Sequence, residues 1–303
     1  MKKIIFILCI VFLMTLFLIV FHKPATLQDR APIPAASNPR VSPEWKSTPV
    51  RLGANDDGWE DSLYVTPDGA RIYFAYYPGD LINDARKGSF KDDIDIYFSD
   101  YPFITKQKET RFNLSEDIWS ATGPQVTVRG DFFYTSNSDY LRDQKSDADI
   151  YLNGERLPFN DALGPDQEFG NPHYCASHDE LWIDEQDTRM WVLKNAQANG
   201  FAGKPELAPT DALPFFQPWL SEDCQVLYFS SNRGDVPGKG PAIYTSQRTD
   251  DAWGTPVPVV SNDVGVGEPT LTGDGKKLFF IQLFKNDRGE FTSDMFYVER
   301  KDV

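Results

Sequence analysis

Glu268-Pro269-Thr270-Leu271-Thr272-Gly273-Asp274-Gly275 is the stretch of sequence that decides the fold. It combines a short strand near a Pro with a tight turn, and two further aromatic strands follow, Lys277–Phe280 and Asp294–Tyr297. The same order of strand, turn, aromatic strand and third strand recurs, with variations, four times upstream. Repeats of this length that each form a small antiparallel sheet are typical of a β-propeller.

The four earlier copies begin at Glu60, Gly123, Asn171 and Gln217, roughly 45 to 65 residues apart. Their strands are rich in Tyr, Phe, Val and Ile, which suit half-buried pleated surfaces. Their turns carry runs such as Pro67-Asp68-Gly69, which tight hairpins require. We therefore predict an all-β fold with five blades.

A blade also needs a fourth, outer strand. After the fourth copy this strand is Trp253–Val259, and a similar segment, Trp45–Leu52, precedes the first copy. No such segment follows the fifth copy, so we expect Trp45–Leu52 to complete the fifth blade and close the ring. Closure removes an exposed sheet edge, and Pro is tolerated in these segments because outer strands are edges.

The repeat resembles the TolB-type, WD-like propeller repeat of bacterial envelope proteins. The resemblance is carried by Thr66-Pro67-Asp68-Gly69, Pro218–Asp223, Ser230–Gly234, Asp95-Ile96-Tyr97 and Asp149-Ile150-Tyr151. It covers nearly all of residues 45–300 and implies a propeller. It implies no single activity, because such propellers serve as binding platforms, partner modules and enzymes alike.

The N-terminus is typical of an exported protein. Two lysines precede an apolar run from Ile4 to Phe21, and His22-Lys23-Pro24 follows it without the small residues of a cleavage site. We expect residues 1–23 to form an uncleaved signal anchor, with a cleaved signal peptide and secretion as the alternative. Residues 24–44, rich in Pro, Ala and Ser, are expected to be a flexible tether, and residues 45–303 the propeller, on the periplasmic side of the membrane.

The chain is acidic, with a formal net charge of −15. Because residues 1–24 contain three lysines and no acidic residue, the remainder has 27 basic and 45 acidic residues, a net charge of −18. Such a surface disfavours nucleic acid and anionic lipid. Neutral glycans, cationic ligands and basic partners remain compatible with it.

Two cysteines lie within the propeller. Cys175 falls in an expected innermost strand and Cys224 just after a turn of the next blade. Export permits a disulfide, but we expect two small buried thiols, the ordinary state of Cys in a core.

The innermost strands of a propeller line its channel, and their side chains alternate in direction. One set of positions is largely apolar and is expected to pack between blades: Asp61, Pro124, Pro172, Pro218 and Pro269, then Leu63, Val126, Tyr174, Leu220 and Leu271. The other set is mostly polar and is predicted to line the channel: Glu60, Gly123, Asn171, Gln217 and Glu268, then Ser62, Gln125, His173, Trp219 and Thr270, then Tyr64, Thr127, Cys175, Ser221 and Thr272.

The predicted channel mouth offers two kinds of chemistry. Glu60 and Glu268 would belong to blades made adjacent by closure, and two neighbouring carboxyl groups are the catalytic pair of a glycoside hydrolase. The ligand-binding candidates are one indole, one imidazole and three amides, which suit a sugar: Gln125, Asn171, His173, Gln217 and Trp219. The alternative is that these polar side chains only cap neighbouring backbone.

Metal chemistry has weaker support. The acidic clusters Lys91–Asp95 and Ser146–Asp149 could hold Ca²⁺, but Asp in such loops is more often a turn former. The three His residues lack the spacing of a zinc site. We therefore expect no cofactor, with Ca²⁺ as the alternative.

Three functions remain open. The first is a membrane-anchored binding module that takes a small polar ligand, glycan or peptide at the channel mouth. The second is a glycoside hydrolase using Glu60 and Glu268. The third is a platform for a protein partner in an envelope complex, with the channel left empty.

Overall fold

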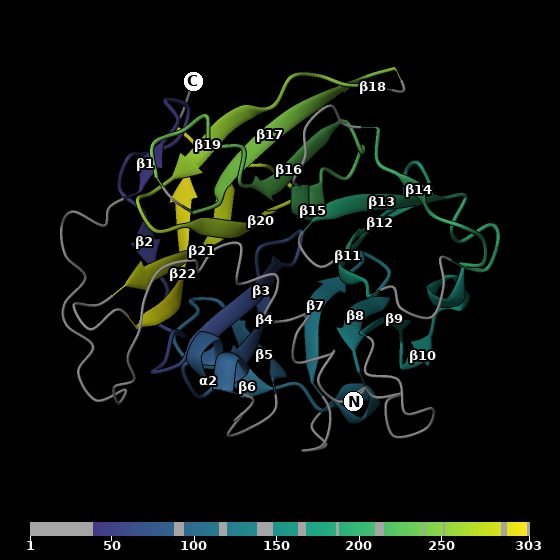
Figure 1. Cartoon of the computed structure of the whole chain (residues 1–303), viewed down its shortest axis with the longest axis horizontal. Coiled ribbons are helices and arrows are strands. Elements are labelled where there is room, and N and C mark those ends of the chain that lie inside the picture. The colour runs from purple at the N-terminus through teal and green to yellow at the C-terminus, as the bar shows by residue number, and fades with distance from the viewer. Residues whose placement is uncertain are drawn as a thin grey trace.

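The computed structural model of the chain is an all-β propeller of five antiparallel sheets around a common axis (Figure 1). The predicted fold class and number of blades are confirmed. The structure describes residues 39–87, 94–114, 120–137, 148–162, 168–185, 188–209, 215–238, 240–250, 252–285 and 290–301. The expected signal anchor and most of the expected tether lie outside these residues. Within them, no helix has the length and apolar character that crossing a membrane requires.

Each blade runs from an innermost strand at the axis to a short outer strand. Blade 1 comprises β3 (Trp59–Val65), β4 (Arg71–Tyr77), β5 (Asp95–Asp100) and β6 (Gln107–Lys108). Blade 2 comprises β7 (Ala121–Val126), β8 (Phe132–Ser136), β9 (Asp149–Leu152) and β10 (Glu155–Arg156). Blade 3 comprises β11 (Gly170–Cys175), β12 (Glu180–Glu185), β13 (Arg189–Lys194) and β14 (Glu206–Leu207).

The last two blades also contain strands from the N-terminal part of the chain. Blade 4 comprises β15 (Phe215–Leu220), β16 (Val226–Ser231), β17 (Ala242–Thr249), β19 (Val257–Ser261) and β1 (Arg40–Val41), with β18 (Ala252–Trp253) paired to β17. Blade 5 comprises β20 (Val266–Leu271), β21 (Lys277–Lys285), β22 (Phe291–Glu299) and β2 (Val50–Arg51). The helices within the described residues are α2 (Leu81–Lys87) and the 3₁₀ turns Arg111–Asn113 and Pro158–Asp161.

Residues 40–54 form a strap along the outside of the ring. Arg40 pairs with Ser261 in blade 4, and Val50 pairs with Tyr297 in blade 5. Between the two pairings, the Trp45 indole is 1% exposed and packs against both blades. Residues 40–44, which were expected to belong to the flexible tether, are therefore part of the propeller.

The apolar core lies between the blades rather than at the axis. Five buried clusters each draw on two neighbouring blades, so every junction has its own core. At the junction of blades 1 and 2, Tyr73 packs edge-on against Phe132, with 5.5 Å between the ring centroids. This arrangement explains the many aromatic residues of the second strands, because such rings bury large apolar areas.

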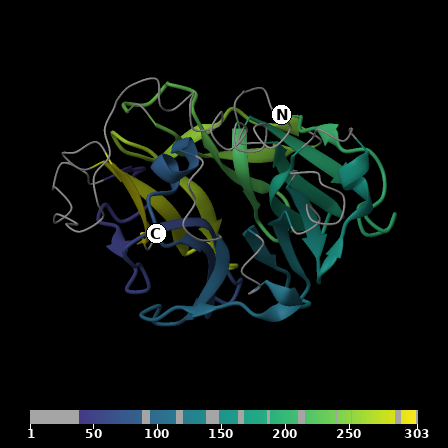
Figure 2. The ribbon, with the colours of Figure 1, turned by 60° about the horizontal axis from the view of Figure 1, so that its bottom comes forward.

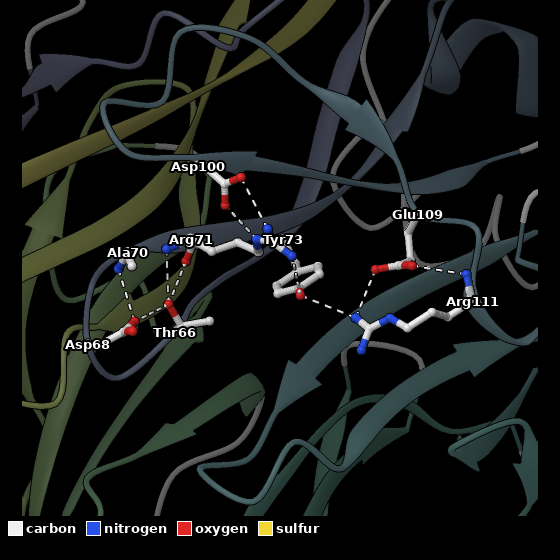
Figure 3. A network of polar contacts seen from close by, with 8 residues as sticks. All are labelled: Thr66, Asp68, Ala70, Arg71, Tyr73, Asp100, Glu109 and Arg111. Atoms are coloured by element: carbon white, nitrogen blue, oxygen red, sulfur yellow. Dashed lines mark hydrogen bonds and ion pairs between the residues drawn. The ribbon is translucent and has the colours of Figure 1, made fainter.

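The surface end of that junction is a polar network (Figure 3). Arg71 and Arg111 both donate hydrogen bonds to the Tyr73 hydroxyl, at 3.4 and 3.2 Å. Arg71 also pairs with Asp100 through two hydrogen bonds of 2.6 and 3.1 Å, and Arg111 pairs with Glu109 at 2.8 Å. Both guanidinium groups are therefore neutralised by carboxylates from their own blade.

The hairpin turns of blades 1, 4 and 5 follow one design. In blade 1 the Thr66 hydroxyl donates to Asp68 at 2.6 Å, and the N–H groups of Ala70 and Arg71 close the turn on these two side chains. The hydroxyl of Thr66 is the main group that lowers the pKa of Asp68. Blades 4 and 5 repeat the design with Ser221 and Asp223, and with Thr272 and Asp274. These turns are at one end of the blades, here called the turn face, opposite α2 (Figure 2).

Cys175 and Cys224 form a disulfide, with 6.0 Å between their Cα atoms. The expectation of two free thiols was wrong. Cys175 ends the innermost strand of blade 3, and Cys224 lies in the turn that follows the innermost strand of blade 4. The two strands are neighbours around the axis, which brings residues 49 positions apart into bonding range. The sequence alone did not reveal this neighbourhood.

Replacing Cys175 by Ser and Cys224 by Gly should lower the free energy of unfolding by about 2–4 kcal/mol, because the unfolded chain loses a cross-link over a long loop. The replacements suit the site. Ser221 of blade 4 and Thr66 of blade 1 occupy the position equivalent to Cys175. Gly69 and Gly275 occupy the position equivalent to Cys224, whose φ is 57°. Chemical denaturation measures the loss. Reduction of the wild type should reproduce it, and equal stability of oxidised wild type and variant would contradict the prediction.

Candidate functional site

Each innermost strand is interrupted by a bulge, where its register with the second strand shifts. The residue in the bulge has a positive φ, between 47° and 58°, in all five blades: Ser62, Gly123, Asn171, Gln217 and Glu268. Left-handed backbone is uncommon for residues other than Gly. Its recurrence in four non-glycine residues indicates that the ring imposes it. These five residues surround one end of the axis, here called the bulge face.

The bulges place one predicted site residue elsewhere. Ser62, not Glu60, is the blade 1 counterpart of Glu268. Glu60 is fully buried and does not line the central cavity; its carboxylate accepts the N–H of Asp56 at 2.8 Å. The pairing of Glu60 with Glu268 across the mouth is therefore not what the structure shows. The alignment failed because blade 1 has Leu63 where the other blades have the Pro that marks the position.

A chain of hydrogen bonds connects four of the bulge residues, and it begins at the Ser62 hydroxyl, which donates to the Asn171 side-chain oxygen at 3.4 Å. The Asn171 amide donates to Asp184 at 2.8 Å, and the same carboxylate oxygen accepts the N–H of Gln217 at 2.9 Å. The Gln217 side chain then donates to the Glu268 carboxylate and accepts the Glu268 N–H at 3.1 Å. Asp184 is 1% exposed and Glu268 7% exposed. Sequence reasoning missed Asp184, because it lies on a second strand and no periodic signal marked it.

Two residues further along each innermost strand, side chains bridge neighbouring blades. The Gln125 amide of blade 2 donates to the carbonyl of Tyr174 in blade 3 at 3.1 Å and accepts its N–H at 2.7 Å. The Tyr64 hydroxyl of blade 1 donates to the Val126 carbonyl of blade 2 at 2.7 Å. Further around the ring, the Val65 N–H of blade 1 donates to the Thr270 hydroxyl of blade 5 at 3.1 Å.

His173 makes the corresponding bridge from blade 3 to blade 4. Its Nε2 lies 3.1 Å from the Leu220 carbonyl, so this nitrogen carries the proton and donates it. The ring is buried, and burial lowers the pKa of His173 to about 3, against the smaller opposing effect of the Leu220 hydrogen bond. His173 is therefore neutral at physiological pH.

Trp219 occupies the equivalent position in blade 4 but acts through packing. Its indole is 8% exposed, and its centroid lies 5.9 Å from the rings of both His173 and Tyr228. The ring does not present an open face on which a sugar could stack. Asn171, His173, Gln217 and Trp219 thus line the central cavity and Gln125 does not, and all five are engaged with neighbouring protein groups.

The space left at the axis is small. The cavity is about 30 Å³, enough for about two water molecules. Its walls are the bulge residues, the residues that follow them, and Tyr64, His173, Trp219 and Thr270, with Glu268 as the acidic member. Sites for small organic ligands are typically about 300–1,000 Å³. The cavity formed by the described residues at this end of the axis is therefore too small for such a ligand.

The described residues contain no group of three or more His, Cys, Asp or Glu side chains arranged to hold a metal ion. Asp95 is paired with Lys108 at 2.8 Å, and Asp149 with Arg156 at 2.5 Å. Most of the two acidic clusters considered for Ca²⁺, residues 91–93 and 146–147, lies outside the described part of the chain.

Replacing His173 by Gln should make the protein less sensitive to mild acid. Gln125 shows that this side chain can bridge two blades from the equivalent position. In the wild type, unfolding exposes a His that binds a proton below pH about 6.5, whereas the folded His stays neutral until about pH 3. Stability is therefore full above the unfolded pKa and falls as the pH decreases.

The expected difference is about 2 kcal/mol of extra destabilisation in the wild type between pH 7 and pH 5. Denaturant titrations of both proteins at the two pH values measure it. His178, which is exposed, provides the control substitution His178→Gln. If the free energy of unfolding fell equally for wild type and H173Q between pH 7 and pH 5, the assignment of a neutral buried imidazole would be contradicted.

No protein-family model matches the chain, and no curated protein matches it. The chain is similar to TolB from Acinetobacter baumannii, with a TM-score of 0.47 and 10% identity over 89% of this chain and 65% of that chain. It thus spans less than two thirds of that TolB chain.

The chain is similar in structure to two enzymes as well. An endo-1,4-beta-xylanase from Bacteroides thetaiotaomicron has a TM-score of 0.41 and 12% identity, over 78% of this chain and 94% of that one. An oligogalacturonate lyase from Vibrio parahaemolyticus has a TM-score of 0.39 and 9% identity, over 86% and 67%. The class of this protein, a five-bladed β-propeller of TolB-like appearance, follows from its own sheets, and we draw no activity from these likenesses.

Proposed function

We propose that this protein is a non-catalytic interaction module that binds a protein partner on the outside of the propeller. The observation that carries the proposal is the small central cavity: about 30 Å³ of space, bounded in part by the bridging side chains Tyr64 and His173. A propeller whose axis is filled still offers large, rigid outer faces. Protein–protein recognition uses such surfaces and needs no cavity.

Glycoside hydrolysis has less support. It requires two carboxyl groups about 5–10 Å apart across a space that admits the sugar. Glu268 is hydrogen-bonded to Gln217, and Glu60 is buried outside the cavity. The same small volume argues against a glycan or peptide bound at the channel mouth.

We also propose that the propeller works outside the cytoplasm, held by residues 1–23 at the membrane. Two observations support this location: the lysines and apolar run at the N-terminus, and the Cys175–Cys224 disulfide. Stable disulfides are rare in reducing compartments and common in exported proteins.

Replacing Glu268 by Gln should change neither glycan binding, glycan cleavage nor cross-linking to a protein, because its carboxylate bonds to Gln217 at the axis rather than to a substrate. The full chain in detergent is titrated with a glycan panel and assayed for glycan cleavage, and we expect neither binding nor turnover. Cross-linking in intact cells should give a discrete adduct with a protein, equal for wild type and E268Q. Glycan binding or cleavage that E268Q abolishes would refute the proposal, as would the absence of any protein adduct.

We further infer that the strap closes the ring. Its support is the pairing of Val50 with Tyr297, the two hydrogen bonds of Arg51 to Asp294 at 3.0 and 2.9 Å, and the burial of Trp45. Burial of one large aromatic side chain alone is worth about 3–5 kcal/mol in substitution experiments.

A chain that begins at Asn55 should therefore be much less stable than a chain that begins at Pro39. Loss of the strap leaves blade 5 without its outer strand and exposes the core between blades 4 and 5. Thermal unfolding of the two truncated chains, compared side by side, measures the effect. Equal melting temperatures would show that the strap is an accessory rather than the closure.

A further inference from the structure

An apolar surface with a lysine at its centre lies at the junction of blades 5 and 1. Three of its members are among the large hydrophobic residues that the described part of the chain leaves exposed: Val50 at 46%, Tyr101 at 67% and Ile104 at 63%. Tyr297 and Lys277 complete it and are half-buried. We call these five residues the seam patch.

Contacts make the seam patch one continuous surface. Val50 lies directly opposite Tyr297 in the sheet, so their side chains share a face. The Lys277 ammonium is 5.3 Å from the centroid of the Tyr297 ring and 5.8 Å from that of Tyr101. The backbone of Ile104 lies against Gly53, three residues after Val50.

The seam patch is rigidly supported. The Tyr101 N–H donates to the Ala70 carbonyl at 2.8 Å, which ties this loop to the hairpin turn of blade 1. The Tyr101 ring packs edge-on against Phe103, and Phe103 packs edge-on against Phe279 in the core. An exposed aromatic residue held in this way loses little conformational entropy when a partner covers it.

Lys277 gives the seam patch a specific chemistry. No carboxylate among the described residues lies within ion-pair distance of its ammonium, although the chain is rich in acids. Two carboxylates interact with it electrostatically but are bonded to other groups: Glu299, opposite Lys277 in the sheet, pairs with Lys46 at 2.5 Å, and Asp274 accepts the Thr272 hydroxyl at 2.7 Å. A cation between two tyrosine rings, whose neighbouring carboxylates are bonded to other groups, is suited to a carboxylate from another molecule.

The seam patch is also far from the point where the N-terminal segment joins the propeller. Arg40 donates to the Pro237 carbonyl and to Asp263, in loops at the bulge face. Tyr101 lies beside the Thr66–Ala70 turn, at the turn face. Arg40, beside the first described residue, therefore lies at the opposite end of the molecule from the seam patch.

We propose that the seam patch binds a short peptide segment of a protein partner, in which a carboxylate stands beside bulky apolar side chains. The carboxylate pairs with Lys277 while the apolar side chains cover Tyr101, Ile104 and Val50. This rests on the proposed function and adds its surface and the chemistry of its partner. At physiological salt, screening confines the attraction of Lys277 for a carboxylate to about 8 Å. The net charge of −15 weakens the binding of acidic peptides to the rest of the molecule.

Selection from a phage-displayed library of random dodecapeptides on the immobilised full chain tests the proposal. The expected result is enrichment of peptides that combine Asp, Glu or a free C-terminal carboxylate with Leu, Ile, Phe or Trp. Synthetic copies should bind the Lys277→Glu and Tyr101→Ser variants at least about tenfold more weakly. Lys277→Arg keeps the cation and should retain most of the affinity.

Val257→Ser is the matched control, because Val257 is 57% exposed on blade 4 and should leave the affinity within about twofold. Thermal unfolding of every variant shows that a lost interaction is not lost folding. Failure to enrich acidic apolar peptides, or equal binding to Lys277→Glu, would overturn the proposal. So would dimerisation abolished by Tyr101→Ser, which assigns the seam patch to a second copy, or binding to neutral lipid vesicles through it.

The cross-linked adduct in cells separates this proposal from the proposed function. If the adduct persists in the Tyr101→Ser, Lys277→Glu double variant, the protein remains an interaction module and the seam patch is the wrong surface. If the adduct is absent already in the wild type, the interaction module itself is refuted, and peptides selected in vitro do not rescue it.

Discussion

The hydrogen bonds between neighbouring innermost strands are the constraint on which the rest of the structure depends. A side chain at the same position of successive blades reaches the backbone of the next blade: Tyr64, Gln125, His173 and Thr270. A buried backbone polar group without a partner is costly, so these bonds fix the distance between blades. They also fill the axis, and the residues that could have held a ligand are used to hold the ring.

The junction between blades 4 and 5 solves the same problem differently. In the described structure, the bridging position of blade 4 is Trp219, which packs against His173 and Tyr228 instead of bonding to blade 5. The strap covers this junction from the outside with the buried Trp45. The disulfide lies one junction away, between blades 3 and 4. Covalent, apolar and polar links are thus distributed around one ring.

Sequence reasoning succeeded where a local signal repeats and failed where it does not. The repeated Pro positioned the innermost strands of blades 2 to 5, and Gln125, Asn171, His173, Gln217 and Trp219 do lie near the axis. Leu63 replaces that Pro in blade 1, so Glu60 was aligned with the wrong partners. The alternation of side chains showed which way these residues point. It contained no information on the space available, which depends on how closely five strands approach.

The sequence by itself determined the class of the fold, because turn residues and alternating aromatic strands act over a few neighbouring positions and recur five times. Tertiary structure decided the bulges, the disulfide, the closed axis and the seam patch. Each of these depends on residues from different blades, whose distances follow from the curvature of the whole ring rather than from any one repeat. The Lys277 ammonium between Tyr101 and Tyr297 is the plainest case: its neighbours are separated by most of the chain.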